Sequence, residues 1–246
     1  HKPAILAMVH AETSTGVCQP MEGIGDLCRK HDCLLLLDTV TSLGGVPLYI
    51  DEWKVDLAYS CSQKGLSCPP GLGPFTMGPR AEAKMTARQG KVPNWYLDVS
   101  LLNQYWGSDR VYHHTAPVNM NFGMREALRL LAEEGLDQAW ARHRSNAEML
   151  WNGLESLGLS MHVPAERRLP TLTTVRIPEG VDGKAFSQHL LNNHGIEVGG
   201  GLGSLAGKIW RIGLMGYNST PENVNRLLNL FETELPRFSG SVAAAA

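Results

Sequence analysis

A lysine and an aspartate that could act together lie beyond two apolar runs in the first part of the chain. Asp38 directly follows Leu34–Leu37, and Lys64 lies five residues after Leu57–Tyr59. Ligands of open α/β sheets bind beyond the carboxyl ends of the strands, so both side chains are expected at one edge of a sheet. An amine can form an imine with an aldehyde, and a carboxylate can keep a ring nitrogen protonated. The two residues therefore suit a cofactor with an aldehyde and a nitrogen ring, although an isolated Lys and Asp also form ordinary surface ion pairs.

These residues are positioned by a predicted sheet whose strands alternate with helical or loop segments, as in α/β proteins. The expected strands are Ala4–Val9, Leu34–Leu37, Leu57–Tyr59 and Phe75–Met77. Four successive apolar positions at Leu34–Leu37 indicate a strand covered on both faces, so we expect mostly parallel neighbours. A crossover helix is predicted over Met21–His31. His10–Gly16 follow the first strand, so they should lie at the same pocket as Asp38 and Lys64.

A smaller unit is predicted after a pair of long helices. Apolar residues recur with helical spacing from Asn119 to Leu154. The elements expected beyond them are strands at Thr171–Ile177, Ile196–Val198 and Ile209–Ile212 and helices near Gly183–Asn193 and Pro221–Glu234. We therefore expect residues 1–125 to be part of a large domain and residues 126–246 to comprise connecting helices and a small α+β C-terminal domain.

Composition argues against several classes of partner. The 22 Lys and Arg are scattered among 24 Asp and Glu, which leaves a formal charge of −2 and no basic stripe for nucleic acid. The longest apolar run is far shorter than the ~20 residues of a membrane helix. Five cysteines form no C-x-x-C pair, so neither a disulfide framework nor a zinc site is predicted. We expect a cytoplasmic protein. The sequence opens without a readable leader, so the peroxisome and the mitochondrion remain alternative locations.

Five ordered motifs carry a family resemblance. They are His10–Val17, Asp38–Gly45, Ser60–Lys64, Tyr112–Thr115 and Lys208–Gly213. On these motifs the chain resembles the alanine–glyoxylate / serine–pyruvate aminotransferases, a class-V branch of the fold-type-I enzymes that use pyridoxal 5′-phosphate (PLP). The resemblance runs from His1 to about Arg237. It implies an incomplete, mostly parallel sheet in the large PLP-binding domain, and a homodimer whose active sites are shared between subunits.

The resemblance also implies a role for each matching residue. Lys64 would form the Schiff base with PLP and act in catalysis together with Asp38, which would pair with the pyridinium nitrogen. The further cofactor contacts implied are Val40 on one ring face, Thr13 near the phenolic oxygen, Gln63 at the phosphate, and Tyr112 and Thr115 at the phosphate of the neighbouring subunit. Arg211 would bind the α-carboxylate of the substrate, a task suited to its rigid fork of donors.

Some of these residues also have simpler explanations. Val40 would be apolar core in almost any fold, and Thr13 could instead cap or close a turn. Arg211 lies within an apolar strand, where a buried guanidinium needs an anion such as a bound carboxylate. His113 and His114 suggest a metal, but adjacent residues of an extended segment face opposite ways. Packing or interface hydrogen bonding is their preferred role, and no metal site is predicted.

The leading hypothesis is a PLP-dependent transaminase. Such an enzyme would move an amino group from alanine or serine to glyoxylate or pyruvate by a ping-pong mechanism, with Lys64 carrying the α-proton. Alternatives on the same scaffold are a 3-hydroxykynurenine transaminase, a lyase or a desulfurase-like enzyme, the last of which needs a mobile nucleophilic cysteine. A non-catalytic interaction module is the alternative outside enzymes. Family members carry further chain before the position of His1, so we interpret this sequence as a truncated enzyme.

Overall fold

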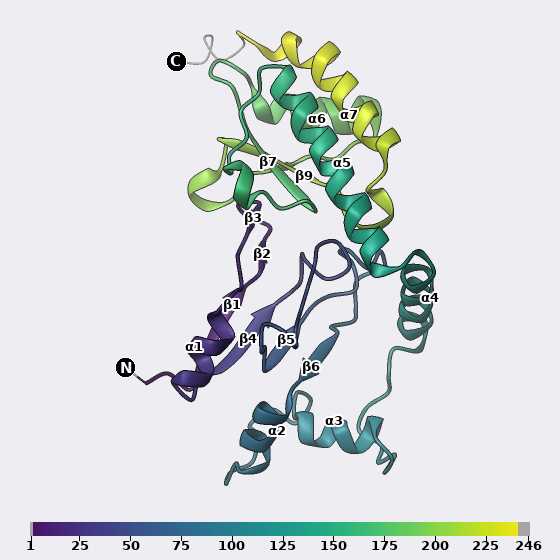
Figure 1. Cartoon of the computed structure of the whole chain (residues 1–246). Helices are drawn as coiled ribbons and strands as arrows, with labels where there is room; N and C mark the ends of the chain where they lie inside the picture. Colours follow the sequence, from purple (N-terminus) through teal and green to yellow (C-terminus); the bar gives the residue numbers. More distant parts are fainter. Residues whose placement is uncertain (1, 241–246) are drawn as a thin grey trace.

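The first part of the chain forms a four-stranded sheet. A computed structural model of the protein describes residues 2–240, and Figure 1 shows their arrangement. The strands, in spatial order, are β1 (Ile5–Val9), β4 (Leu34–Asp38), β5 (Leu57–Tyr59) and β6 (Phe75–Met77). β1, β4 and β5 run parallel, whereas β6 is antiparallel to β5. The predicted α/β fold with a mostly parallel sheet is confirmed.

Successive leucines make β4 the buried centre of this sheet. Leu35 and Leu37 are fully buried, and β1 and β5 pair with the two edges of β4. The helix α1 (Ile24–Lys30) lies within the predicted crossover segment, and its Cys28 packs in the same core cluster. The register of β4 and β5 sets Asp38 directly opposite Tyr59, so the end of the buried strand fixes where the carboxylate lies.

A short hairpin, which the sequence analysis did not predict, connects the first sheet to a second sheet in the C-terminal part of the chain. Its strands are β2 (Ala11–Glu12) and β3 (Val17–Cys18), which pair antiparallel. The Thr174 hydroxyl donates to the Thr15 carbonyl at 2.8 Å. Gly16 has a φ of +76°, and a Cβ at this position would lie 2.9 Å from Oγ1 of Thr174. Glycine therefore permits both the turn and its close approach to the second sheet.

Helices occupy the middle of the chain. They are α2 (Pro79–Thr86), α3 (Val99–Trp106), α4 (Val118–Glu134) and α5 (Leu136–Ser156). The long helical region expected from Asn119 to Leu154 is confirmed, and Gly135, with a φ of +86°, divides it into α4 and α5. The sequence analysis did not predict α2 and α3, which have only eight residues each and no long apolar period. Among the described residues, no helix has both the length and the apolar composition needed to cross a membrane.

An antiparallel sheet forms the centre of the C-terminal part. Its strands, in spatial order, are β7 (Leu172–Arg176), β9 (Ile209–Gly213) and β8 (Gly199–Gly200). The helices are α6 (Gly183–His194) and α7 (Pro221–Glu234), and the short 3₁₀ turns are η1 (Ala165–Arg167), η2 (Gly203–Leu205), η3 (Gly216–Asn218) and η4 (Leu235–Phe238). Both helices lie where the sequence predicts them, as do β7 and β9.

The prediction of a strand at Ile196–Val198 is wrong. Gly195 adopts a φ of +65°, and the backbone nitrogen of Ile196 donates to the Leu190 carbonyl at 3.1 Å. The segment therefore closes the C-terminus of α6, as a left-handed glycine commonly does. The ladder to β9 begins only at Gly199, which pairs with Arg211.

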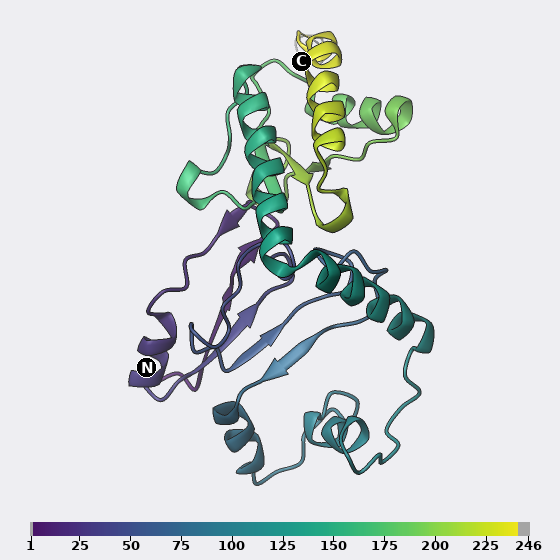
Figure 2. The ribbon, with the colours of Figure 1, turned by 45° about the vertical axis from the view of Figure 1, so that its right-hand side comes forward.

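Aromatic side chains form the middle of the C-terminal core. Phe186, Trp210 and Phe231 are at most 2% exposed and meet edge to face, with ring centroids 5.0–5.5 Å apart. The helices α5 and α7 pack side by side over this core (Figures 1 and 2). Since side chains alternate along a strand, the burial of Trp210 in this core directs its neighbour Arg211 to the other face of the sheet.

Candidate active site

A cavity of about 680 Å³ opens between the two sheets. Gln63, Lys64 and Ser67 reach it from the loop that follows β5, Arg211 reaches it from β9, and Tyr217 from η3. The fold therefore brings Arg211 together with Gln63 and Lys64, from which it is far apart in the sequence. Lys64 is half-buried, and among residues 2–240 its side-chain amine forms neither a hydrogen bond nor an ion pair. The ordinary Lys64–Asp38 ion pair is thus absent from the described structure.

The loop that carries Lys64 is a tight, hydrogen-bonded turn. The backbone nitrogen of Ser67 donates to the Lys64 carbonyl at 2.9 Å, and that of Cys68 donates to the Ser62 carbonyl at 3.0 Å. The buried Ser62 hydroxyl donates to the Pro69 carbonyl at 2.7 Å. Ser67 adopts a φ of +56°, a conformation that non-glycine residues adopt rarely. These bonds fix the backbone, so the Lys64 side chain projects from a rigid base.

The turn η3 packs directly on this loop. The backbone nitrogen of Tyr217 donates to Oγ of Ser67 at 2.8 Å. Gly216 has a φ of +57°, and a Cβ there would lie 1.9 Å from the same oxygen, so glycine is required by both conformation and space. On its other side η3 is held by α5, since Arg142 donates to the Gly216 carbonyl at 2.9 Å and His143 accepts from its nitrogen at 2.8 Å.

Asp38 and Val40 lie together at the end of β4. Oδ1 of Asp38 accepts from the backbone nitrogen of Val40 at 2.8 Å, and Oδ2 accepts from the Tyr59 hydroxyl at 2.7 Å. The bond to Asp38, with burial and the carboxylate charge, raises the pKa of Tyr59 to about 12, so the phenol stays a donor. Asp38 does not line the 680 Å³ cavity, but both oxygens are fixed in orientation at the neighbouring strand end.

Arg211 has protein partners, contrary to the expectation that only an anion could satisfy it. Its side chain is half-buried; Nε donates to the Gly200 carbonyl at 2.7 Å, and Nη1 donates to the Thr13 carbonyl at 3.3 Å. Within the described residues Nη2 makes no hydrogen bond. A Cβ on Gly199 would lie 3.5 Å from Nη2, so the glycine leaves open space beside this nitrogen. Two backbone carbonyls thus orient the guanidinium while Nη2 remains available to a ligand.

Thr13 lies beside Arg211 through its carbonyl, and its hydroxyl has no hydrogen bond within residues 2–240. The turn of the hairpin is closed by Glu12, whose carbonyl accepts from Gly16 at 2.8 Å and whose carboxylate accepts from Ser14 at 2.7 Å. The simpler explanation, in which the Thr13 hydroxyl closes the turn, is therefore wrong. That hydroxyl is left free to contact a bound group.

Tyr112 and Thr115 lie together, away from the cavity, on the segment between α3 and α4. The Tyr112 hydroxyl is 2.9 Å from Oγ1 of Thr115, and Tyr112 is 70% exposed. Between them, Nδ1 of His113 is 2.9 Å from Nδ1 of His114, and His113 stacks on Trp95 with ring centroids 3.9 Å apart. The expectation that the two histidines face opposite ways is wrong, because the segment is not a regular strand. Their described contacts are packing and hydrogen bonding.

The sequence analysis missed several residues of this site. Ser67, Glu197 and Tyr217 line the cavity, yet none belongs to a motif with a recognisable spacing. Glycine at position 216 was the one available signal, since an isolated glycine often marks a close approach of two segments. The sequence analysis also missed a group of two histidines and a glutamate outside the cavity.

The lysine beyond a parallel strand, the carboxylate at the neighbouring strand end and the overall fold match those of the fold-type-I class of PLP-dependent enzymes. Solved structures confirm that fold: an alanine–glyoxylate aminotransferase from Nostoc sp. is 65% identical with a TM-score of 0.92, over 94% of this chain and 62% of that one. A ureidoglycine–glyoxylate aminotransferase from Bacillus subtilis is 42% identical with a TM-score of 0.94, over 96% of this chain and 61% of that one.

The sequence identifies the family within that class. Residues 1–227 match the family described as Aminotransferase class-V, and the chain belongs to this family of PLP-dependent enzymes. The alanine–glyoxylate aminotransferase of Oryctolagus cuniculus is 47% identical over 232 residues, which cover 92% of this chain and 59% of that protein. The predicted resemblance is thus confirmed, and the chain spans about 59% of the length of this curated relative.

The residues present fit PLP. The Lys64 amine, which has no partner among the described residues, and the exposed amide of Gln63 face one cavity, whose volume lies within the usual range of about 300–1,000 Å³ for ligand sites. Asp38 offers a fixed carboxylate at the neighbouring strand end, where ligands of such sheets bind. The aldehyde, phosphate and ring nitrogen of the cofactor each find a chemically matching group.

Proposed function

We propose that the protein is a PLP-dependent transaminase that moves an amino group from alanine or serine to glyoxylate or pyruvate by a ping-pong mechanism. The observation that carries the proposal is the shared cavity of Lys64 and Arg211, an amine and a guanidinium that approach one space from two different sheets. The names of the similar proteins, which are glyoxylate aminotransferases, support glyoxylate as an acceptor.

Each residue has a defined chemical task in this proposal. PLP, when bound, supplies an aldehyde and an electron-accepting pyridinium ring. Lys64 would hold the cofactor at its aldehyde carbon and, once the substrate amine has displaced it, would act as the free amine that accepts the proton of the substrate α-carbon. Asp38, whose carboxylate is oriented by the Tyr59 hydroxyl, would keep the ring nitrogen protonated. Gln63 would donate its amide to the phosphate, Val40 would pack on one face of the ring, and the Thr13 hydroxyl would donate to the phenolic oxygen.

Arg211 orients the substrate. Its Nε and Nη1 are held by backbone carbonyls, so the guanidinium is oriented before a ligand arrives. The α-carboxylate of the donor binds at Nη2 and displaces or shares the long Nη1 contact, which places the α-carbon toward Lys64. Because the arginine side chain is already ordered, binding of the carboxylate costs less conformational entropy than binding to a mobile side chain. This arrangement therefore favours a productive geometry.

We also propose a homodimer in which Tyr112 and Thr115 bind the phosphate of the partner's cofactor. Large apolar side chains on the segments before and after them in the sequence are exposed, including Trp95, Trp106 and Phe122, each more than 50% exposed. Exposed apolar clusters of this kind favour association with a second copy. In this proposal residues 1–125 are part of the PLP-binding domain, and residues 126–246 are the connecting helices and small domain. The free state of all five cysteines supports a reducing compartment such as the cytoplasm.

The test is the attachment site of the cofactor. Borohydride treatment of the PLP-loaded protein should fix the cofactor on Lys64, as peptide mass spectrometry would show, and Lys64→Ala should abolish both the adduct and turnover. Lys91→Ala, at an exposed lysine, is the matched control and should retain both. An adduct that persists in Lys64→Ala would refute the assignment. A panel of amino donors and 2-oxo acids then identifies the substrates, and activity restricted to 3-hydroxykynurenine or to cysteine would favour the alternative enzymes.

A further inference from the structure

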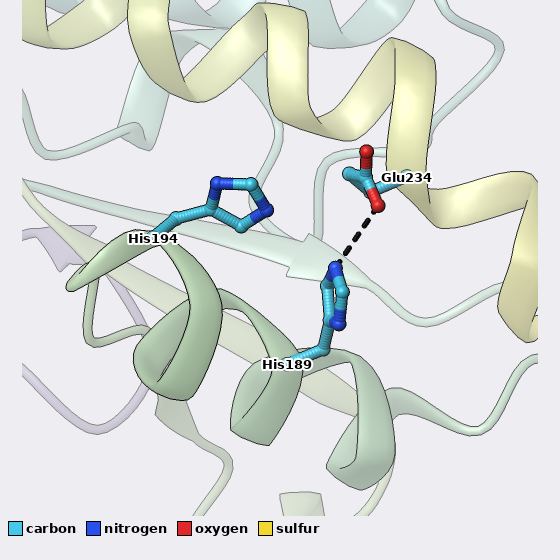
Figure 3. A group of neighbouring side chains, drawn as sticks. All are labelled: His189, His194 and Glu234. Carbon is cyan, nitrogen blue, oxygen red and sulfur yellow. Dashed lines mark hydrogen bonds and ion pairs between the residues drawn. The ribbon is translucent and has the colours of Figure 1, made fainter.

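Two histidines and a buried glutamate meet between α6 and α7, outside the cavity of Lys64 and Arg211. His189 and His194 belong to α6, and Glu234 is the last residue of α7. One ring nitrogen of each histidine and one carboxylate oxygen lie within 4.8 Å of one another. Figure 3 shows the three side chains directed into the same space between the two helices.

The contacts of these groups leave ligand positions open. Nε2 of His189 is 2.9 Å from Oε2 of Glu234, and Arg237 donates to the same oxygen at 2.7 Å. Within residues 2–240, Oε1 of Glu234 and both ring nitrogens of His194 have no hydrogen-bond partner. His189 and His194 lie close, with ring centroids 5.3 Å apart. The site thus combines the bonded pair of His189 and Glu234 with a neighbouring imidazole, that of His194, whose nitrogens are unused in the described part of the chain.

The position of Glu234 favours a cation. Glu234 is only 9% exposed, and burial of a carboxylate costs free energy unless the charge is paired. It also ends α7, where the partial negative charge of the last carbonyl groups disfavours a second negative charge. Arg237 offsets part of this cost, but that side chain is itself 66% exposed, so solvent screens the pair.

We propose that His189, His194 and Glu234 bind one divalent transition-metal ion, with zinc as the first candidate. Imidazole nitrogen and carboxylate oxygen are ligands of Zn²⁺, and three protein ligands with one water molecule complete a tetrahedron. Metal–ligand bonds of about 2.0–2.2 Å place ligand atoms roughly 3.3–3.6 Å apart. The side chains, whose donor atoms are at most 4.8 Å apart, therefore need only small rotations. Arg237 remains on Oε2 as an outer partner that orients the carboxylate.

The site would join the ends of two helices of the C-terminal part, so its expected effect is on stability. The competing description is a metal-free ion-pair network of protonated His189, Glu234 and Arg237. That network gives His194 no function and predicts no stoichiometric metal binding. The two descriptions therefore differ in a directly measurable quantity.

The test is a titration of the chelator-treated protein with Zn²⁺ and with Co²⁺. We expect one ion per chain and visible ligand-field bands of Co²⁺ without the thiolate charge-transfer band that ligation by any of the five cysteines would add. Zn²⁺ at ~100 times its Kd should raise Tm by about 5–10 °C for a chain of this size. His194→Gln is the least disruptive variant, since the His194 ring has no protein partner in the described part of the chain.

His189→Ala and His194→Gln should each weaken Zn²⁺ binding at least about 10-fold, the effect typical of losing even an outer partner of a metal site. His31→Ala, at an exposed histidine on the C-cap of α1, should leave the affinity unchanged. The proposal is overturned if the unaltered protein binds no stoichiometric ion, or if binding survives in the His189→Ala/His194→Gln double variant.

Discussion

Nε2 of His143 accepts a hydrogen bond from the backbone nitrogen of Gly216 at 2.8 Å, while Nδ1 of the same ring lies 2.6 Å from the Ala139 carbonyl oxygen. Since the first contact needs a lone pair and the second a proton, the ring is neutral and carries its proton on Nδ1. Burial lowers the pKa of His143, which keeps this state at neutral pH. Because Gly216 packs on Ser67, a buried ring in α5 is linked through Gly216 to the loop that carries Lys64.

We expect His143→Ala to lower the free energy of unfolding by about 3 kcal/mol, because it removes two buried hydrogen bonds and leaves a cavity. Urea denaturation at neutral pH measures this. Ser67→Ala is the control, since it removes only the acceptor of the Tyr217 nitrogen and should cost about 1 kcal/mol. Both variants should also lower kcat/KM by loosening the Lys64 loop. Equal stability costs for the two variants would contradict the proposed role of His143.

His10 should make the stability sensitive to acid. The ring is 3% exposed, burial lowers its pKa to about 4, and Nδ1 has no hydrogen-bond partner in the described structure. Below pH ~6.5 the unfolded chain binds a proton that the folded protein binds only near pH 4. The unfolded state thus binds more protons in this window, so stability falls as the pH falls through it, by up to about 3 kcal/mol.

The variant His10→Phe should flatten the stability curve between pH 6.5 and 4, as urea denaturation at several pH values would measure. It should cost little at pH 8, because Nδ1 has no hydrogen-bond partner in the described structure and Nε2 has only the weak contact to Sγ of Cys18 at 3.7 Å. His31→Phe, at an exposed histidine, is the control and should leave the slope unchanged. A slope that persists in His10→Phe would assign the acid sensitivity to other groups, His143 first among them.

The elements that the sequence predicts are those with one dominant period. Leu34–Leu37 has four apolar residues in a row, and Pro221–Glu234 combines an apolar stripe with a Thr220 cap, so burial and local signals agree. The hairpin of β2 and β3 has strands too short to show a period. It is held by Thr174, which is 159 residues from its partner Thr15, and no local pattern carries such a contact.

Long-range contacts of the candidate site are likewise absent from any local sequence pattern. The motifs identify Lys64 and Arg211 because their residue types are chemically specific. They do not reveal that Tyr217 packs on Ser67 across 150 residues, or that backbone carbonyls satisfy Arg211. The expected need for an anion at Arg211 was wrong because burial of a strand does not imply burial of the end of a long side chain.

Asp38 and Tyr59 should have separable effects. Asp38→Asn should retain some PLP but lose most activity, because a neutral amide no longer favours the protonated ring nitrogen. Tyr59→Phe removes only the hydrogen bond that orients Oδ2, so a fall of about 10-fold in kcat/KM is expected. PLP titration and steady-state kinetics measure both effects. Near-normal turnover of Asp38→Asn would remove Asp38 from the proposed chemistry.

Arg211 should determine the affinity for the donor amino acid and leave that for PLP unchanged. Arg211→Lys replaces a rigid fork by a point charge, and it also loses the fixed contacts to Gly200 and Thr13 that orient the group. Since a hydrogen bond to a charged group contributes about 1.5–3 kcal/mol, we expect kcat/KM to fall by the order of 10², mainly through KM, and further in Arg211→Ala. Steady-state kinetics with several donors measure this.

The matched control for Arg211 is Arg176→Ala, an exposed arginine on the neighbouring strand β7, which should leave both constants unchanged. PLP titration of Arg211→Ala separates the two possible roles, because a substrate residue affects KM whereas a phosphate residue affects cofactor binding. The loss of the Gly200 contact should lower the free energy of unfolding by only about 1 kcal/mol, so the variant is expected to stay folded. If Arg211→Ala released PLP while the KM of the remaining activity stayed constant, the substrate assignment would be wrong, and β9 would belong to the phosphate site.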